Sequence, residues 1–351
     1  MVISRLGMGA KPAREVNGGS IRTEERPASL RWLLEYGVAG KFEAYGALEA
    51  WWGVFRQTRC QWPDAIDQAL VGGMIADRLA FAFAAGYQAA LRALVPSVPQ
   101  DRLVSFSVTE EGGAHPRAVN STLRATVATT GETVWRLSGR KRWTTLSCEA
   151  GVALIVASTG REENGRNQLR VAEVSLAAPG VTLRPMPPTA FTPEIGHAEI
   201  ILNDVALPAA ALLPGDGYAD YVKPFRTVED IHVTAAVIGH LLGIALRFRW
   251  PSTVREDLTF LAGGVRALAF GDPKGFQTHV GLSGLFRAVQ AVLEACEPLW
   301  SLAAPEVEAR WRRDVALLQV ASGTRSRRTD AAWRSAWAGS GGPGEPEGSG
   351  T

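Results

Sequence analysis

The sequence contains few of the residues that mark metal, disulfide or membrane proteins. It has three cysteines, and Cys60, Cys148 and Cys296 are far apart and form no Cys-x-x-Cys pair. We therefore expect neither a disulfide framework nor a metal site, and a reducing cytoplasm fits best. There is no apolar stretch of the roughly 18 residues that a membrane span needs, and no leader-like N-terminus, so membrane insertion and export are not expected.

A concentrated charge of one sign is also missing. The formal net charge is +2, from 37 Lys and Arg against 35 Asp and Glu. Nucleic acid and anionic membranes are usually bound by a basic stripe, so neither is expected as a partner. Six arginines gather between residues 310 and 328, but their spacing is typical of a solvated helix face or of paired side chains. No internal repeat is present.

Three kinds of segment follow one another along the chain. Long Ala- and Leu-rich stretches near both ends predict helices, whereas the middle alternates and turns like short strands. The expected fold is α+β, with an N-terminal helical domain, a central small β-barrel or sandwich, and a C-terminal helical bundle. The expected boundaries are a flexible arm at 1–26, the N-terminal helical domain at 27–103, the β domain at 104–216, the C-terminal helical domain at 217–337 and a disordered Gly-rich tail at 338–351.

Local signals refine this plan. Ser29 and Thr227 are each expected to cap the start of a helix, and residues 304–337 are expected to form one long helix. Gly-containing pairs predict turns between the strands. They are Thr130-Gly131, Ser138-Gly139, Asn164-Gly165 and Pro179-Gly180.

Three motifs in the middle of the chain carry a family resemblance. They begin at Phe106 (Phe-Ser-Val-Thr-Glu-Glu-Gly-Gly), Leu137 (Leu-Ser-Gly-Arg-Lys-Arg-Trp-Thr-Thr) and Glu199 (Glu-Ile-Ile-Leu-Asn-Asp-Val-Ala-Leu-Pro). In this order and at these separations they resemble the motifs of the acyl-CoA dehydrogenase superfamily, over about two fifths of the chain. The resemblance implies a divergent member, shortened at its C-terminus, and an FAD-dependent oxidoreductase.

The resemblance also implies flavin contacts in the β domain. Phe106 stands at the aromatic position of the first motif. Val108 and Thr109 would face the pyrimidine edge of the ring, Trp143 would flank it, and Thr145 would reach N5. A reduced flavin needs such fixed hydrogen-bond donors and an apolar wall. Each residue also has a structural interpretation, because Thr is common in strands and Trp143 can belong to the core.

The dehydrogenation of an acyl thioester also needs a partly desolvated carboxylate as base. Ser322-Gly323-Thr324 resembles the motif that carries the base in most of the family, with Ser in place of Glu, but its position favours a preceding long helix. Glu229 instead stands where a minority of the family places the base, and is the candidate catalytic residue. Asp230 replaces an Arg and would raise the pKa of Glu229 further. The alternative is that Glu229 is an ordinary acidic residue in a first helical turn.

Other positions depart from the family. His115 replaces a Ser that contacts the cofactor pyrophosphate, Glu111 replaces a Pro, and the Arg-Gln-Phe-Gly motif is absent, with Arg247 or Arg249 as substitutes. His232 and His240 read as helix histidines with satisfied hydrogen bonds.

Two classes of function stay open: an acyl-CoA dehydrogenase-like enzyme, or a flavin monooxygenase on the same fold, and a non-catalytic subunit of a hetero-oligomer. The expected partners are acyl-CoA or another acyl thioester, an electron-acceptor flavoprotein or oxygen, and copies of the chain or a homologue.

Overall fold

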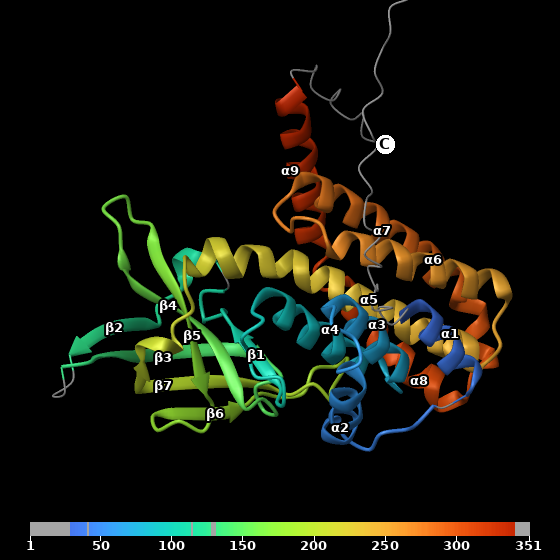
Figure 1. Ribbon diagram of the computed structural model, residues 1–351, viewed down its shortest axis with the longest axis horizontal. Coiled ribbons are helices and arrows are strands. Elements are labelled where there is room, and N and C mark those ends of the chain that lie inside the picture. Colours follow the sequence, from blue (N-terminus) through green and yellow to red (C-terminus); the bar gives the residue numbers. More distant parts are fainter. Residues whose placement is uncertain (1–28, 41, 114, 128–130, 341–351) are drawn as a thin grey trace, which may run out of the picture.

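A computed structural model describes residues 29–40, 42–113, 115–127 and 131–340. Figure 1 shows a curled sheet at one end of the molecule and helices filling the other end, with the long helix α5 (Lys223–Arg247) running between them. This arrangement confirms the expected α+β fold class.

The N-terminal helices have an almost continuous apolar sequence, so they pack into the core. Trp51 is fully buried and stacks against Phe55 and Phe81, so it belongs to the core. The last of these helices ends at Leu94, just before Pro96, since proline cannot continue the ladder of hydrogen bonds. The four helices are α1 (Ser29–Val38), α2 (Leu48–Arg59), α3 (Ala65–Ile75) and α4 (Leu79–Leu94).

The seven strands of the described chain form one sheet. Its order is β1-β4-β2-β3-β7-β6, with β5 paired to β4 outside this path. Most neighbours are antiparallel, but β1 runs parallel to β4. The strands are β1 (Val104–Ser107), β2 (Thr122–Val127), β3 (Thr133–Thr145), β4 (Val152–Arg161), β5 (Asn167–Ser175), β6 (Val181–Pro185) and β7 (His197–Pro208).

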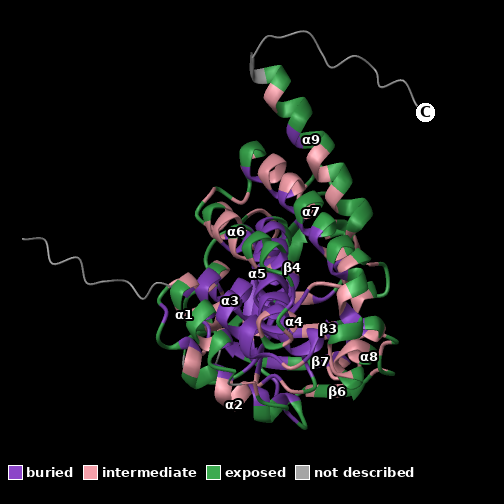
Figure 2. Cartoon of the chain, turned by 90° about the vertical axis from the view of Figure 1, so that its right-hand side faces the viewer, coloured by how far each residue is buried: buried purple, intermediate pink, exposed green. Residues whose placement is uncertain are grey.

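The C-terminal helices pack around α5, which is buried along most of its length (Figure 2). One helical stretch of the described chain, Gly217–Arg247, has the length and composition to cross a membrane, but 83% of its most apolar window is buried inside the protein, as in a core helix. The remaining helices are α6 (Ser252–Ala269), α7 (Phe276–Cys296), α8 (Pro305–Asp314) and α9 (Ser322–Ser340).

Three local expectations are wrong. Ser138-Gly139 lies inside β3, where the pairing with β7 shifts register, so Gly139 with φ +148° marks a bulge and not a turn between strands. Ser29 is itself a helical residue of α1, and its hydroxyl donates to Asp67 while no described backbone amide donates to it. The expected helix at 304–337 is divided by a 3-10 segment, Val315–Gln319, into α8 and α9.

Thr227 is not a helix cap either. A π-helical turn, Gly217–Val222, precedes α5, and the carboxylate of Asp216 accepts hydrogen bonds from the amides of Tyr218 and Ala219. The helical path therefore begins about ten residues before Thr227. Of the predicted turn glycines, Gly165 and Gly180 have positive φ and connect strands, and Gly131, also with positive φ, follows Thr130, which lies outside the described residues.

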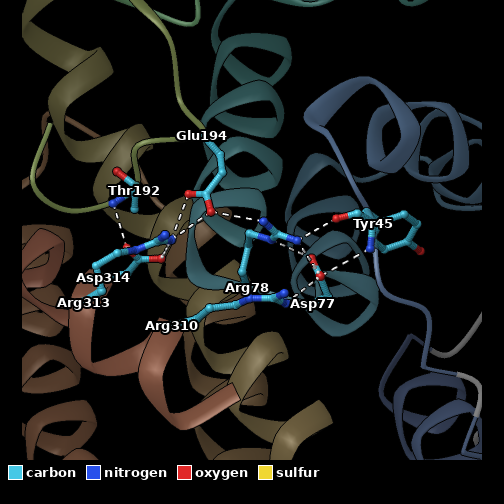
Figure 3. Close-up of polar contacts among 8 residues, drawn as sticks. All are labelled: Tyr45, Asp77, Arg78, Thr192, Glu194, Arg310, Arg313 and Asp314. Carbon is cyan, nitrogen blue, oxygen red and sulfur yellow. Dashed lines mark hydrogen bonds and ion pairs between the residues drawn. The ribbon is translucent and has the colours of Figure 1, made fainter. Parts of the chain in front are cut away.

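A buried ion-pair network connects α8 to the rest of the molecule (Figure 3). Arg313 bonds both Glu194, which precedes β7, and Asp314, whose carboxylate accepts from the amide of Thr192. Arg78 pairs with the same Glu194 and with Asp77, which also receives a hydrogen bond from Arg310. These bonds fix α8 against the start of α4 and the connection between β6 and β7.

Candidate functional site

The residues of the first motif form the end of β1 and the segment after it. Phe106 is buried within β1, and Val108 and Thr109 follow the strand with partial exposure. The carbonyl of Thr109 accepts from the amide of Arg142, which attaches this segment to β3. In the described chain, neither the amide nor the hydroxyl of Thr109 has a hydrogen-bond partner, so both remain available to a ligand.

A buried ion pair holds the first and second motifs together. Lys141 Nζ lies 2.7 Å from Glu110 Oε1, and Lys141 is fully buried. Glu110 also accepts hydrogen bonds from the amides of Asn120 and Ser121. Burial raises the pKa of Glu110, but Lys141 and these amides outweigh it and keep the pKa below the usual value. Burial lowers the pKa of Lys141 as well, and Glu110 acts against that shift. The pair fixes the spacing of the two motifs.

Trp143 is presented outward by an irregularity in β3. The pairing of β3 with β7 shifts register between Lys141 and Thr144, and Trp143 takes a left-handed φ of +53°. Its side chain is 50% exposed, although Lys141, two residues earlier in the same strand, is fully buried. Bulges and left-handed backbone of this kind are common beside functional sites, where they redirect a side chain. The ring lies edge-on to His197, at 6.1 Å between centroids.

Thr145 lies next to β1 at the end of β3. Its carbonyl accepts a 2.8 Å hydrogen bond from the hydroxyl of Ser105, the residue before Phe106. The amide of Phe106 in turn donates to the hydroxyl of Tyr87 on α4. The five predicted flavin contacts thus lie on two adjoining stretches of the β domain, beside α4.

An aromatic contact connects this face with the predicted base. The ring of Phe106 meets that of Phe225 edge-on at 4.8 Å, and Phe225 also contacts Tyr87 at 5.9 Å. Glu229 follows Phe225 by one turn of α5, so its carboxylate lies on the side of the helix that faces these rings.

Glu229 is in a setting that favours its neutral form. Its pKa is raised to about 8, mainly by burial and also by the charge of the adjacent Asp230, while Arg325 and Arg226 act in the opposite direction. Asp230 thus raises the pKa of Glu229, as the sequence predicts. The carboxylate of Glu229 makes no hydrogen bond to another described residue, so it is not occupied by a structural role. Since α5 begins before Thr227, Glu229 is also not a first-turn acid.

A cavity of about 650 Å³ lies beside this part of α5. It is bounded by α5, α7 and α9, and Arg325 and Ser322 stand on its α9 side. Glu229 is not part of its lining, but Val233 is, one turn further along α5. Ser322 therefore faces a cavity at the start of its own helix, contrary to the expectation that it lies within a preceding long helix.

The other polar residues singled out from the sequence have local partners. His232 and His240 are buried and contact the carbonyls of Val228 and Ala76. His115 is exposed, and its ring accepts from the amide of Arg117. Glu111 is exposed.

Neither arginine offered as a phosphate contact is placed in the site. Arg247 lies over the rings of Phe42 and Phe248, and Arg249 adopts φ +52° just after α5. The described residues contain no group of three or more His, Cys, Asp or Glu side chains that could hold a metal ion.

Comparisons with known proteins concern the domain and the fold. Residues 105–205 match the family model of the acyl-CoA dehydrogenase middle domain. A probable acyl-CoA dehydrogenase of Bacillus subtilis (strain 168) is 28% identical over 158 residues, which cover 43% of this chain and 38% of that relative. The match therefore spans less than half of the curated relative.

Two solved structures share the whole fold. Butyryl-CoA dehydrogenase from Megasphaera elsdenii has a TM-score of 0.61 at 15% identity, covering 88% of this chain and 98% of that one. KijD3, solved with FMN and a dTDP-linked sugar, has a TM-score of 0.57 at 18% identity, covering 89% of this chain and 91% of that one. The predicted resemblance is confirmed for the middle of the chain, where residues 105–205 match an acyl-CoA dehydrogenase middle domain, and the fold is that of the two solved structures.

Several residues of the site were not predicted from the sequence. Tyr87 and Phe225 contact each other near Glu229, and Arg325 and Arg328 reach Asp230. Phe225 lies one helical turn before Glu229, a spacing that could have indicated it. The arginines lie about a hundred residues further along the chain, and no local pattern points to their partner.

Proposed function

We propose that this protein is a flavin-dependent oxidoreductase of the acyl-CoA dehydrogenase type, which dehydrogenates an acyl thioester at its α,β-bond with FAD as hydride acceptor. The observation that carries the proposal is Glu229, a carboxylate with a raised pKa and no structural partner, one turn from an aromatic contact with the predicted flavin face. Perturbed carboxylates in such places are frequent among general bases.

The residues of the β domain fit a flavin. Trp143 offers a half-exposed planar surface, and Thr109 offers an amide and a hydroxyl without protein partners. In the proposed complex Val108 and Thr109 bind the polar edge of the ring, Trp143 flanks it with Phe106 nearby, and Thr145 reaches N5. A bound flavin would accept the hydride from the β-carbon. Fixed donors on a buried scaffold favour the charge that develops in the ring, because they need no reorganisation.

Glu229 is proposed to take the α-proton. With a pKa of about 8 it is largely protonated at neutral pH, and only its ionised form can act as a base. Reduction of the flavin by substrate is therefore expected to accelerate as pH rises towards and through about 8. Burial of the carboxylate disfavours its charged form, which keeps it basic once it is ionised.

An alternative function is favoured by exposed apolar side chains. Trp143 and Trp333 of α9 are 50% and 40% exposed, as would suit a subunit that contributes to an oligomer without its own turnover. A monooxygenase on the same fold would use the same flavin face and oxygen as acceptor. The proposal also includes an acyl thioester as substrate and an acceptor flavoprotein or oxygen as electron acceptor. It further includes a homo- or hetero-oligomer as the assembly and a cytoplasmic location.

The first experiment asks whether the full-length protein holds FAD. The purified protein, with FAD added if it is colourless, should show a protein-bound flavin spectrum, and Trp143→Ala should weaken binding by about tenfold or more through the loss of a stacking surface. A protein that stays colourless after FAD is added would overturn the enzyme proposal and leave the partner-subunit alternative.

The second experiment tests the base. In Glu229→Gln we expect FAD to bind normally, while anaerobic bleaching by an acyl-CoA slows by about 10²–10⁴-fold, the usual contribution of a general base. Glu256→Gln, which changes an exposed carboxylate on α6, serves as the matched control and should bleach at the wild-type rate. Equal bleaching in Glu229→Gln and the control would remove Glu229 from the mechanism.

A further inference from the structure

Two arginines of α9 converge on one carboxylate of α5. Arg325 Nη2 lies 2.8 Å from Asp230 Oδ1, and Arg328 Nη2 lies 2.5 Å from Asp230 Oδ2. All three side chains are mostly buried, with Asp230 only 10% exposed. Each carboxylate oxygen of Asp230 is thus paired with one arginine. This double pairing is stronger and more directional than a single surface ion pair.

The same arginines connect three helices. Arg325 donates to the carbonyl of Leu318 and lies over the ring of Phe286 on α7, at 4.5 Å. Arg328 reaches the hydroxyl of Thr227 at 3.5 Å, and Thr227 also contacts the ring of His279 on α7 at 3.3 Å. The contacts to Asp230 therefore fix the first turns of α9 beside α5 and α7, where α9 forms one wall of the 650 Å³ cavity.

Without its pairing to Arg325 and Arg328, the buried negative charge of Asp230 beside Glu229 would be energetically costly. The two residues are adjacent on α5 and largely buried, and two carboxylates so placed resist simultaneous ionisation. The charged and titratable groups around Glu229 are Asp230 and Arg226 on its own helix, Arg325 and Arg328 on α9, and Tyr87 on α4. His279 on α7 faces Arg328 and Thr227.

We propose that Arg325 and Arg328 are positioning residues for the candidate base: by pairing with Asp230 they neutralise its charge and allow Glu229 to ionise. The proposal rests on the proposed function for its meaning in catalysis, but its physical content concerns only these four side chains. Neither arginine makes a hydrogen bond to Glu229. Arg325 favours the ionised Glu229 directly through its charge as well as through Asp230, and Arg328 acts through Asp230.

A merely structural role makes a different prediction. If the arginines only attached α9, their loss would lower stability and leave the protonation of Glu229 unchanged. If they compensate Asp230, their loss must move the protonation of Glu229 to higher pH, and loss of Asp230 must move it to lower pH, because two arginines then remain without their carboxylate. The opposite signs separate the two roles.

The experiment follows the carboxyl C=O infrared band of Glu229 in the full-length protein against pH, and Glu229→Gln identifies the band by its loss. This measurement needs neither flavin nor turnover. Arg325→Gln with Arg328→Gln should raise the midpoint by about one pH unit or more, and Asp230→Asn should lower it. Arg327→Gln, on an exposed face of the same helix with a single contact to Thr324, is the matched control and should leave the midpoint in place.

The arginine double variant is informative only while α9 stays in place, which near-ultraviolet circular dichroism of its tryptophans reports. Should it unfold, Asp230→Asn, which keeps the shape of the side chain, decides alone. An unchanged midpoint in Asp230→Asn overturns the proposal, as does an unchanged midpoint in a folded double variant. Shifted midpoints in a protein that binds no flavin would support the coupling and reject the proposed enzyme, so the two failures are distinguishable.

Discussion

At the scale of single residues, the second motif places one side chain in the interior and another at the surface of β3. Lys141 points into the protein and meets Glu110, whereas Trp143, two residues later, is half exposed. In a regular strand residues two apart point to the same side, so the register shift after Lys141 is what separates their directions. The buried pair fixes the scaffold and the bulge presents the ring.

The buried pair gives a first prediction. Lys141→Met should destabilise the protein by about 3–5 kcal/mol, because it leaves the carboxylate of Glu110 buried without its cation. Urea unfolding monitored by tryptophan fluorescence measures the loss. The control is Arg136→Met, which breaks the exposed pair with Asp204 at 3.2 Å and should cost about 0–1 kcal/mol. Similar losses in both variants would contradict the assigned role of Lys141.

At the scale of elements, α5 depends on close contact between backbones. A Cβ added at Gly239 would lie 2.1 Å from the carbonyl oxygen of Leu70 on α3, and one at Gly73 would lie 1.9 Å from that of Ala236. Backbone atoms cannot give way as a flexible side chain can. The glycines therefore set the distance between α3 and α5, and with it the position of Glu229, nearly three turns before Gly239.

This contact gives a prediction with an internal control. Gly239→Ala should destabilise the protein by about 2–3 kcal/mol or more through overpacking. Gly263→Ala, on α6 with open space around the added Cβ, should stabilise it by about 0.5–1 kcal/mol, because alanine loses less conformational entropy in a helix. Thermal unfolding of the two variants measures the difference. A stabilised Gly239→Ala would show that the two helices can separate at no cost.

Elements with a strong local pattern were predictable from the sequence, and those decided by distant contacts were not. The strand at β7 and the apolar run of α5 follow from their own periodicity. The Ser138-Gly139 pair has the composition of a turn, yet β7 pairs with β3 on both sides of it and keeps it within the strand. The start of α5 was misplaced because Thr227 resembles a cap, while Asp216 caps an earlier π-helical turn.

The same division holds for the candidate site. Thr109, Trp143 and Glu229 were singled out by resemblance, because their motifs are local in sequence. Their roles stay proposals. The groups that set the charge of Glu229 could not be found this way, since Arg325 is 95 residues from Asp230 and meets it only through the packing of α9.

At the scale of the whole molecule, buried titratable groups set how stability depends on pH. Burial lowers the pKa of His232 and His240 to about 4 from 6.5, so the folded state binds fewer protons there than the unfolded chain. Their contribution is complete above pH 6.5 and is lost as pH falls towards 4. Burial raises the pKa of Glu229 to about 8 from 4.5, so its contribution is present below pH 4.5 and is lost as pH rises to 8.

Among the groups that titrate between pH 4 and 8, these three have the largest pKa shifts, and they predict a stability maximum near pH 6.5. Between pH 4.5 and 6.5 two histidines oppose one glutamate, and the free energy of unfolding should rise by about 1.4 kcal/mol per pH unit. Above 6.5 only Glu229 acts, so stability should fall at about the same rate up to pH 8. In Glu229→Gln the decline above 6.5 should vanish and the rise below it should double, whereas Glu256→Gln should follow the wild-type curve. Urea unfolding at half-unit steps from pH 4.5 to 8.5 measures both slopes, and an undiminished decline in Glu229→Gln would show that Glu229 ionises freely in the folded protein.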